Sequence, residues 1–264
     1  MNLSKWYGTI RISWTNTLAY RINFFLEVLG PVIVFFFINY NLWSSIYQND
    51  QTIIIKGYSL GDMLSYHSWS MVVALIATGH HSANLSEDIR LGRISSFLIY
   101  PFQFWEYQTA NFLAFQMLQL FIASVFISVL NFTGLIAVPS FFQVLQTLVY
   151  ASFVGLFWFL LQYLIGVLAF WLEETWILRV LLQIIAGFLA GAYFPIDLYP
   201  DWAQELLAYT PFPYLRYYII QGFMGKTSSF GNAYLILCSW SVLIVFLLRF
   251  AWTRGIKRYS AAGM

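Results

Sequence analysis

Six long apolar stretches occupy most of this 264-residue chain. A membrane-spanning helix needs about 20 mostly apolar residues, because each residue rises about 1.5 Å across a hydrocarbon core roughly 30 Å thick. The stretches are residues 22–43, 63–83, 107–132, 141–171, 178–194 and 234–252. Only 9% of the residues are charged, whereas about 25% are charged in a soluble domain. The sequence therefore predicts an all-α polytopic membrane protein, with six transmembrane helices in a single domain, residues 1–264.

Basic residues are distributed unequally between the two sides of such a six-span arrangement. With a cytoplasmic N-terminus, ten basic residues lie on the cytoplasmic side, and only Lys56, Arg216 and Lys226 lie outside. Cytoplasmic loops of membrane proteins carry an excess of Lys and Arg. We therefore expect both termini in the cytoplasm. The ten residues are Lys5, Arg11, Arg21, Arg90, Arg93, Arg179, Arg249, Arg254, Lys257 and Arg258.

The segment before the first stretch has the pattern of an amphipathic helix. Trp6, Ile10, Trp14 and Leu18 recur every four residues, while Ser and Thr residues between them make the segment too polar to span. This pattern predicts an interfacial helix over residues 3–21 that lies along the cytoplasmic leaflet. The alternative is a simple extension of the first span.

A second charged segment, residues 84–100, separates the second and third stretches. Glu87 and Asp88 are suited to the first turn of a short helix, where the helix dipole favours anions. Arg90 and Arg93 are three residues apart, a spacing that predicts one shared helical face, and Gly92 permits a turn. The segment is either a solvated cytoplasmic anchor or a surface that docks another protein.

Residues 195–225, between the fifth and sixth stretches, form the most irregular segment. Four of the seven prolines of the chain fall here, at positions 195, 200, 211 and 213, and proline interrupts helices. Between these breaks the sequence predicts two short helices that dip into the outer membrane face and return. We expect Trp202, Leu206 and Tyr209 to be buried against neighbouring spans. Three acids, Asp197, Asp201 and Glu205, are expected near water. The alternative is a flexible external connector.

Motifs for chemistry within the chain are missing from the sequence. It has no Gly-rich lysine loop for nucleotides, no His-Glu-x-x-His zinc motif and no Gly-x-Ser-x-Gly elbow. We therefore expect no enzyme activity, no bound metal and no cofactor in this chain. Glu27 is the one acid inside a predicted span, where a structural or gating contact is favoured over proton coupling. Energy for uphill transport would then come from another chain.

These features together resemble the permease subunits of the ATP-binding-cassette (ABC) type-2 exporter superfamily, and most of all its short six-span bacterial members. The likeness is carried by the N-terminal helix and by Glu87-Asp-Ile-Arg-Leu-Gly-Arg-Ile…Leu-Ile-Tyr-Pro101. It is carried most specifically by Phe194-Pro-Ile-Asp-Leu-Tyr-Pro-Asp-Trp…Thr-Pro-Phe-Pro-Tyr214. The likeness covers essentially the whole chain.

The resemblance implies roles for two groups of residues. Residues 84–92 would match the coupling helix that sits in a groove of the cytoplasmic ATPase, with Glu87, Asp88, Arg90, Gly92 and Arg93 at the contact. Residues 201–209 and 214–223 would match paired outer re-entrant helices. The outer gate would comprise Pro195, Tyr199, Pro200, Trp202, Leu206, Pro211, Phe212, Pro213 and Tyr214.

The resemblance also implies partners and a location. Two ABC ATPase subunits, with ATP and magnesium bound on them, would drive transport. A second permease, identical or diverged, would face the first, second and fifth spans, in the bacterial inner membrane among its lipids. No nucleic acid is expected. The substrate would be amphipathic or lipid-like. The short outer loop, residues 44–62, favours release at the outer leaflet. An ATP-independent carrier and a non-transporting membrane scaffold are the alternative functions.

Overall fold

The structure is a computed structural model that describes residues 3–19, 21–77, 85–95, 103–133, 136–172, 174–227 and 229–259. Throughout these ranges the chain is helical, and it contains no β-strand there. Glu27 lies within a helix, but its side chain is outside this description, so its contact stays a prediction. Asn84, the first residue of the predicted segment 84–100, is also outside it.

Among the described residues, three helices are long and apolar enough to cross a membrane, namely α6 (Phe104–Thr133), α7 (Phe141–Val167) with the 3-10 turn η2 (Leu168–Phe170), and α12 (Gly231–Gly255). Shorter apolar helices are Ile33–Ile46, within α2 (Arg21–Ile46), and α8 (Trp176–Leu189). The remaining helices are α1 (Leu3–Ala19), α3 (Leu60–Ile76), α4 (Leu85–Arg90), η3 (Ile196–Leu198), α9 (Asp201–Ala208), α10 (Phe212–Leu215) and α11 (Tyr217–Phe223). The all-helical class is thus confirmed.

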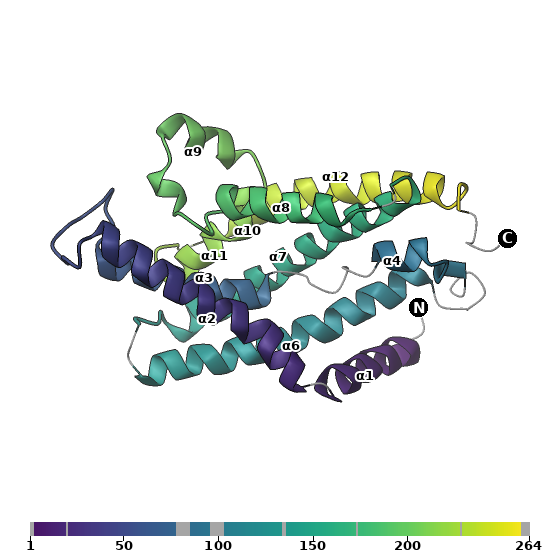
Figure 1. Cartoon of the computed structure of the whole chain (residues 1–264), viewed down its shortest axis with the longest axis horizontal. Helices are drawn as coiled ribbons and strands as arrows, with labels where there is room; N and C mark the ends of the chain where they lie inside the picture. Colours follow the sequence, from purple (N-terminus) through teal and green to yellow (C-terminus); the bar gives the residue numbers. More distant parts are fainter. Residues whose placement is uncertain are drawn as a thin grey trace.

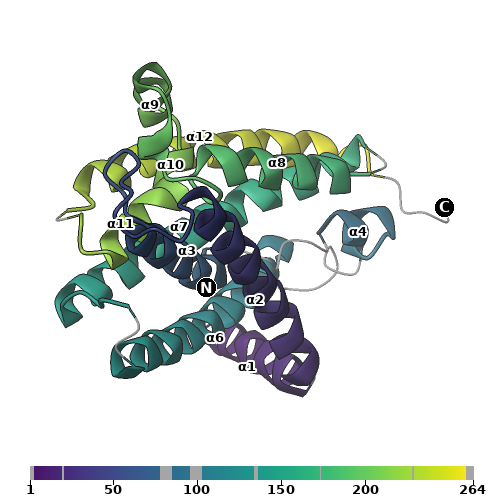
Figure 2. The same ribbon diagram turned by 60° about the vertical axis from the view of Figure 1, so that its left-hand side comes forward.

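The helices form an elongated bundle in which α6, α7 and α12 run roughly along the longest axis (Figure 1). α4 and the C-terminal end of α12 lie at one end, and α9 lies at the other, in both views (Figures 1 and 2). We call these the α4 end and the α9 end. The helix α7 is central, because α3, α4, α11 and α12 all pack against it.

An aromatic core joins α7 to the helices around it. Trp69 of α3 stacks on Phe223 of α11, with ring centroids 4.9 Å apart, and both side chains are fully buried. Tyr150 of α7 stacks on Phe230 at 4.4 Å, and its hydroxyl donates to the carbonyl of Tyr214 at 2.8 Å. Offset aromatic pairs stabilise beyond the area they bury. These contacts fix α11 onto α3, and fix α10 and the start of α12 onto α7.

The helix α1 packs alongside α6. The Trp14 indole N–H donates to the carbonyl of Ala114 at 2.6 Å, and the Ser13 hydroxyl donates to Asn111. Figure 1 shows α2 leaving α1 at an angle. A helix over residues 3–19 is therefore present as the sequence predicts, and its placement on a membrane surface stays a prediction.

The helix α8 ends early. Its 14 residues span roughly 21 Å, less than the hydrocarbon core of a bilayer. Gly191, at φ +80°, turns the chain, and the N–H of Ala192 donates back to Gly187 at 3.0 Å. The last carbonyls find partners elsewhere: Ala190 accepts from the N–H of Tyr217 at 2.9 Å, and Gly191 accepts from the Tyr66 hydroxyl at 2.5 Å.

Candidate functional site

The helix α4 is fastened to the bundle by its apolar side. Leu85 and Ile89 are buried, and Leu85 lies directly on Gly166 of α7. A Cβ atom at Gly166 would come within 2.6 Å of Leu85 Cδ2, so the contact depends on the missing side chain. On the charged side of α4, Glu87 and Arg90 are exposed, whereas Asp88 is largely covered.

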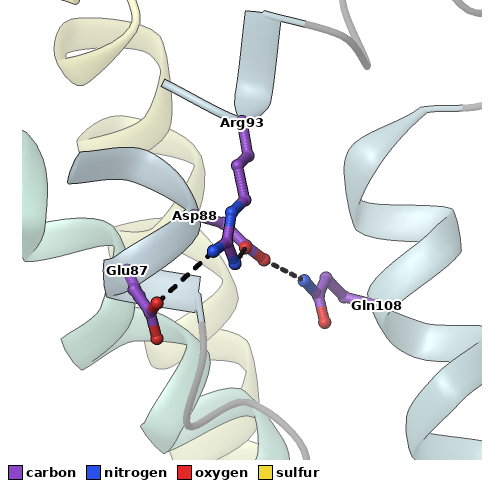
Figure 3. A network of polar contacts seen from close by, with 4 residues as sticks. All are labelled: Glu87, Asp88, Arg93 and Gln108. Atoms are coloured by element: carbon purple, nitrogen blue, oxygen red, sulfur yellow. Dashed lines mark hydrogen bonds and ion pairs between the residues drawn. The ribbon is translucent and has the colours of Figure 1, made fainter. Parts of the chain in front are cut away.

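A turn at Gly92, with φ +74°, brings Arg93 back over the first turn of α4 (Figure 3). Its Nη1 lies 3.3 Å from Asp88 Oδ1, and its Nη2 lies 3.5 Å from Glu87 Oε1. Gln108 of α6 donates to the other oxygen of Asp88 at 3.4 Å. Burial raises the pKa of Asp88, and the Arg93 guanidinium opposes that rise. Four of the predicted coupling residues are thus in or beside one network.

Arg90 takes a different partner. Its Nη1 lies 2.5 Å from Oε1 of Glu174, a residue just before α8, and both side chains are exposed. The prediction that Arg90 and Arg93 share one helical face is wrong, because α4 ends at Arg90 and Arg93 follows the turn. Glu174 was not singled out by the sequence, since no local spacing links it to α4. We call Glu87, Asp88, Arg90 and Arg93 the α4 charge cluster.

At the α9 end, a second polar group surrounds a single carboxylate. Asp197 accepts hydrogen bonds from the hydroxyls of Tyr58 and Tyr217, the latter at 2.7 Å, and from Gln221 Nε2 at 3.5 Å. Gln221 also donates to the Tyr58 oxygen at 2.9 Å. Burial and the neighbouring carboxylate raise the pKa of Tyr58. We call these four residues the Asp197 cluster. It joins the loop before α3 to η3 and α11.

The helix α9 packs with the face opposite to the one predicted. Trp202, Leu206 and Tyr209 are 70%, 64% and 82% exposed, whereas Ala203 and Leu207 are buried. The predicted burial of the aromatic face is therefore wrong. Both faces of this helix carry apolar residues, and the smaller pair fits closely against the protein. Asp201 and Glu205 are exposed as predicted, whereas Asp197 is half-buried within its cluster.

The prolines of the predicted gate mark the ends of short helices. Pro195 precedes η3, Pro200 precedes α9, and Pro211 precedes α10, which contains Pro213. Tyr199 and Tyr214 tie the segment together: their hydroxyls donate to the carbonyls of Phe188, at 3.1 Å, and Ala208, at 2.8 Å. Phe212 is the first residue of α10 and is half-buried.

Arg216 interrupts the helix that the resemblance implies over residues 214–223. Its backbone, at φ −144° and ψ −55°, separates α10 from α11. Its side chain lines a cavity of about 210 Å³ between α3, α7 and α8. Sequence reasoning counted Arg216 only as an outer basic residue. A lone cation in an apolar, aromatic segment was the available signal, because charged residues at membrane depth are costly and are usually functional.

These features define an integral membrane protein with a charged short helix at one end of a helical bundle. The family described as "ABC-2 family transporter protein" matches residues 32–263, and the chain belongs to this family. It is thus an ABC-2-type permease subunit, in a family that is normally non-catalytic and works with separate ABC ATPase subunits. No curated protein and no solved structure matches the chain.

Proposed function

We propose that this chain is the permease half of an ATP-driven exporter for an amphipathic or lipid-like substrate, and that a cytoplasmic ATPase binds it at α4. The observation that supports the coupling role is the two-sided construction of α4. Its apolar side is fixed on Gly166 of α7, while its charged side is left largely exposed. A helix built in this way can receive a displacement on one side and pass it to α7 on the other.

The route from α4 into the bundle follows α7. Closure of two ATPases on ATP and magnesium, which those subunits bind, would displace α4 and with it the Leu85–Gly166 contact. Further along α7, Tyr150 holds the carbonyl of Tyr214 and stacks on Phe230. A movement of α7 would therefore reach the α10–α11 region and the α9 end.

The membrane arrangement that we propose has six spans, with α2, α3 and α8 added to the three membrane-length helices. Both termini and α4 would be cytoplasmic, in a bacterial inner membrane, and residues 195–225 would form the outer re-entrant gate. The hydrogen bonds of Tyr217 and Tyr66 to the end of α8 support this, because backbone groups inside a membrane need protein partners. A second permease, identical or diverged, would cover the exposed apolar residues of α2 and α8.

Charge reversal tests the coupling role of α4. The double variant Arg90→Glu, Arg93→Glu should weaken ATPase copurification and substrate-stimulated hydrolysis by about tenfold or more, because charge contacts in an interface would become repulsive. The matched control is Lys257→Glu, Arg258→Glu, which makes the same charge change after α12. Both variants should insert normally.

Normal ATPase association and coupling in the Arg90, Arg93 variant would reduce α4 to a solvated anchor. Reconstituted vesicles separate the other functions. Transport that continues without any ATPase would identify a carrier, and ATPase binding without transport of any amphiphile would identify a scaffold.

A further inference from the structure

The cavity beside Arg216 lies well inside the bundle. Trp158 and Gln162 line it from α7, and they follow the start of that helix by roughly 26 and 32 Å. Ala186 and Gly187, near the end of α8, and Ala77, after α3, also line it. The cavity therefore lies along the second half of α7, between the Asp197 cluster, which includes Tyr217 next to Arg216, and Gly166, which contacts α4.

The charge of Arg216 has no counter-ion within the part of the chain that the structure describes. No ion pair or hydrogen bond engages its guanidinium there; its electrostatic neighbours are the phenols of Tyr66 and Tyr193. The carboxylate of Asp197, which accepts from Tyr217 next to Arg216, is already held by Tyr58, Tyr217 and Gln221. Withdrawing a cation from water costs several kcal/mol unless an opposite charge compensates it.

Part of that compensation comes from α8. Its C-terminal carbonyls carry a partial negative charge, and the carbonyl of Ala190 is bonded to the N–H of Tyr217, next to Arg216. A helix end supplies about half an elementary charge. An anion in the cavity would supply the rest.

The remaining wall residues suit an anion. No acidic side chain lines the cavity, and Arg216 is accompanied there by the amides of Gln162 and Gln183, the indole of Trp158 and the phenol of Tyr193. Each of these groups has an N–H or O–H that can donate. A guanidinium binds carboxylate and phosphate through two parallel hydrogen bonds.

The opening of the cavity indicates what accompanies the anion. Gln183 both lines the cavity and is exposed, so the cavity reaches the surface of α8 there. Leu181, Ile184 and Phe188 make the adjacent surface apolar and exposed. At about 210 Å³, the cavity is smaller than the roughly 300–1,000 Å³ pockets that enclose a whole small ligand. It has room for a headgroup, with apolar tails left outside along α8.

We propose that the Arg216 cavity binds the anionic headgroup, a phosphate or carboxylate, of the amphiphile that this permease moves. This inference rests on the proposed transport function, which it extends by naming the charge of the substrate. Arg216 is then the residue that selects anionic over zwitterionic amphiphiles.

Binding by the full-length chain in phosphatidylcholine nanodiscs tests the site without any ATPase. Short-chain phosphatidic acid, short-chain phosphatidylcholine and inorganic phosphate are titrated in parallel by calorimetry. We expect phosphatidic acid to bind at least tenfold more tightly than the other two. Arg216→Gln should remove that preference, and Arg216→Lys should retain part of it, because Lys keeps the charge without the paired geometry.

Two further variants keep the test decisive. Gln183→Glu places a carboxylate at the exposed mouth of the cavity and should abolish anion binding, even if Arg216→Gln fails to fold. Lys56→Gln removes a basic side chain that contacts the carbonyl of Tyr199 outside the cavity, and should leave binding unchanged.

The outcomes separate this inference from the proposed function. Equal binding of phosphatidic acid by wild type, Arg216→Gln and Gln183→Glu would overturn the site, even if transport persisted. Inorganic phosphate binding as tightly as phosphatidic acid would also overturn it, since a soluble anion would then be the ligand. Arg216-dependent binding without ATP-driven transport would leave the site standing and reject the exporter.

Discussion

The α4 charge cluster and the Asp197 cluster are both polar groups at opposite ends of one bundle, but they are built differently. The α4 charge cluster consists of charge pairs, with Arg90 and Arg93 largely exposed to solvent. The Asp197 cluster consists of one carboxylate among neutral donors, and Tyr58 and Gln221 within it are buried. The arginines of the first are exposed, whereas the residues of the second are buried or half-buried.

This difference indicates that the α4 charge cluster is suited to binding a partner, whereas the Asp197 cluster stabilises the fold. Exposed ion pairs typically contribute about 0–1 kcal/mol to folding, because water already solvates both partners. A half-buried carboxylate that accepts several hydrogen bonds contributes more, because its removal leaves several buried donors without partners. The α4 charges can therefore exchange their ion pairs for contacts with another molecule at little cost in stability. The Asp197 cluster instead joins the loop before α3 to η3 and to α11.

The largest effect on stability is expected from Asp197→Ala. Tyr58, Tyr217 and Gln221 would lose their shared acceptor, and we expect the free energy of unfolding to fall by about 4 kcal/mol, since hydrogen bonds to charged groups contribute about 1.5–3 kcal/mol each. Thermal unfolding in detergent measures the change. Asp201→Ala, which removes an exposed carboxylate four residues later, should change it by less than about 0.5 kcal/mol. Equal losses of unfolding free energy in Asp197→Ala and Asp201→Ala would show that the Asp197 cluster does not stabilise the fold.

A somewhat smaller effect is expected beneath the α4 charge cluster. Leu85→Ala removes a fully buried side chain on Gly166 and should cost about 3 kcal/mol, as for other buried leucines. Leu91→Ala is the matched control; its side chain is 51% exposed, and the expected cost is under about 0.5 kcal/mol. The same detergent melts measure both. ATPase coupling should also fall in Leu85→Ala, although every charge of α4 remains. Unchanged coupling would show that α4 does not act through its contact with Gly166.

The smallest effect is expected from Asp88→Asn. Burial raises the pKa of Asp88 in the folded protein, so the folded state binds its proton more tightly than the unfolded chain does. Stability from this group is fully present at low pH and is lost as pH rises through the folded pKa. Hydrogen exchange of α4 at pH 4 to 7 should show protection that declines with pH in wild type more than in Asp88→Asn. The opposite slope would mean that Arg93, rather than burial, controls this carboxyl.

Local patterns predicted the parts of the molecule that depend on neighbours in sequence. The helical class followed from the apolar stretches, the α4 helix from residues 84–100, and the helix breaks at the α9 end from proline. The sequence pattern did not predict which face of α9 packs against the protein, because Trp202 and Leu206 are as apolar as Ala203 and Leu207. In a membrane protein the lipid-facing side is also apolar, so periodicity alone does not identify the packed side.

The missed site residues depend on contacts between distant segments. Tyr58 meets Asp197 across 139 positions, and Gln221 meets Tyr58 across 163. Arg90 meets Glu174 across 84. No helical or strand period relates such pairs, so a single sequence contains no signal for them. Arg216 was visible as a cation, but its cavity is made by α3, α7 and α8 together.

The packing of Tyr150 also has a consequence for biogenesis. Its ring is covered by Phe230 at 4.4 Å and by Tyr234 at 5.0 Å, residues that the ribosome adds about 80 positions later. Segments fold in order as they are made. The Tyr150 ring of α7 therefore stays uncovered during synthesis until α8 to α11 have been made. A nascent chain truncated before residue 230 should be recognised by membrane quality-control proteases. Insertion of α12 is the step that covers the Tyr150 ring.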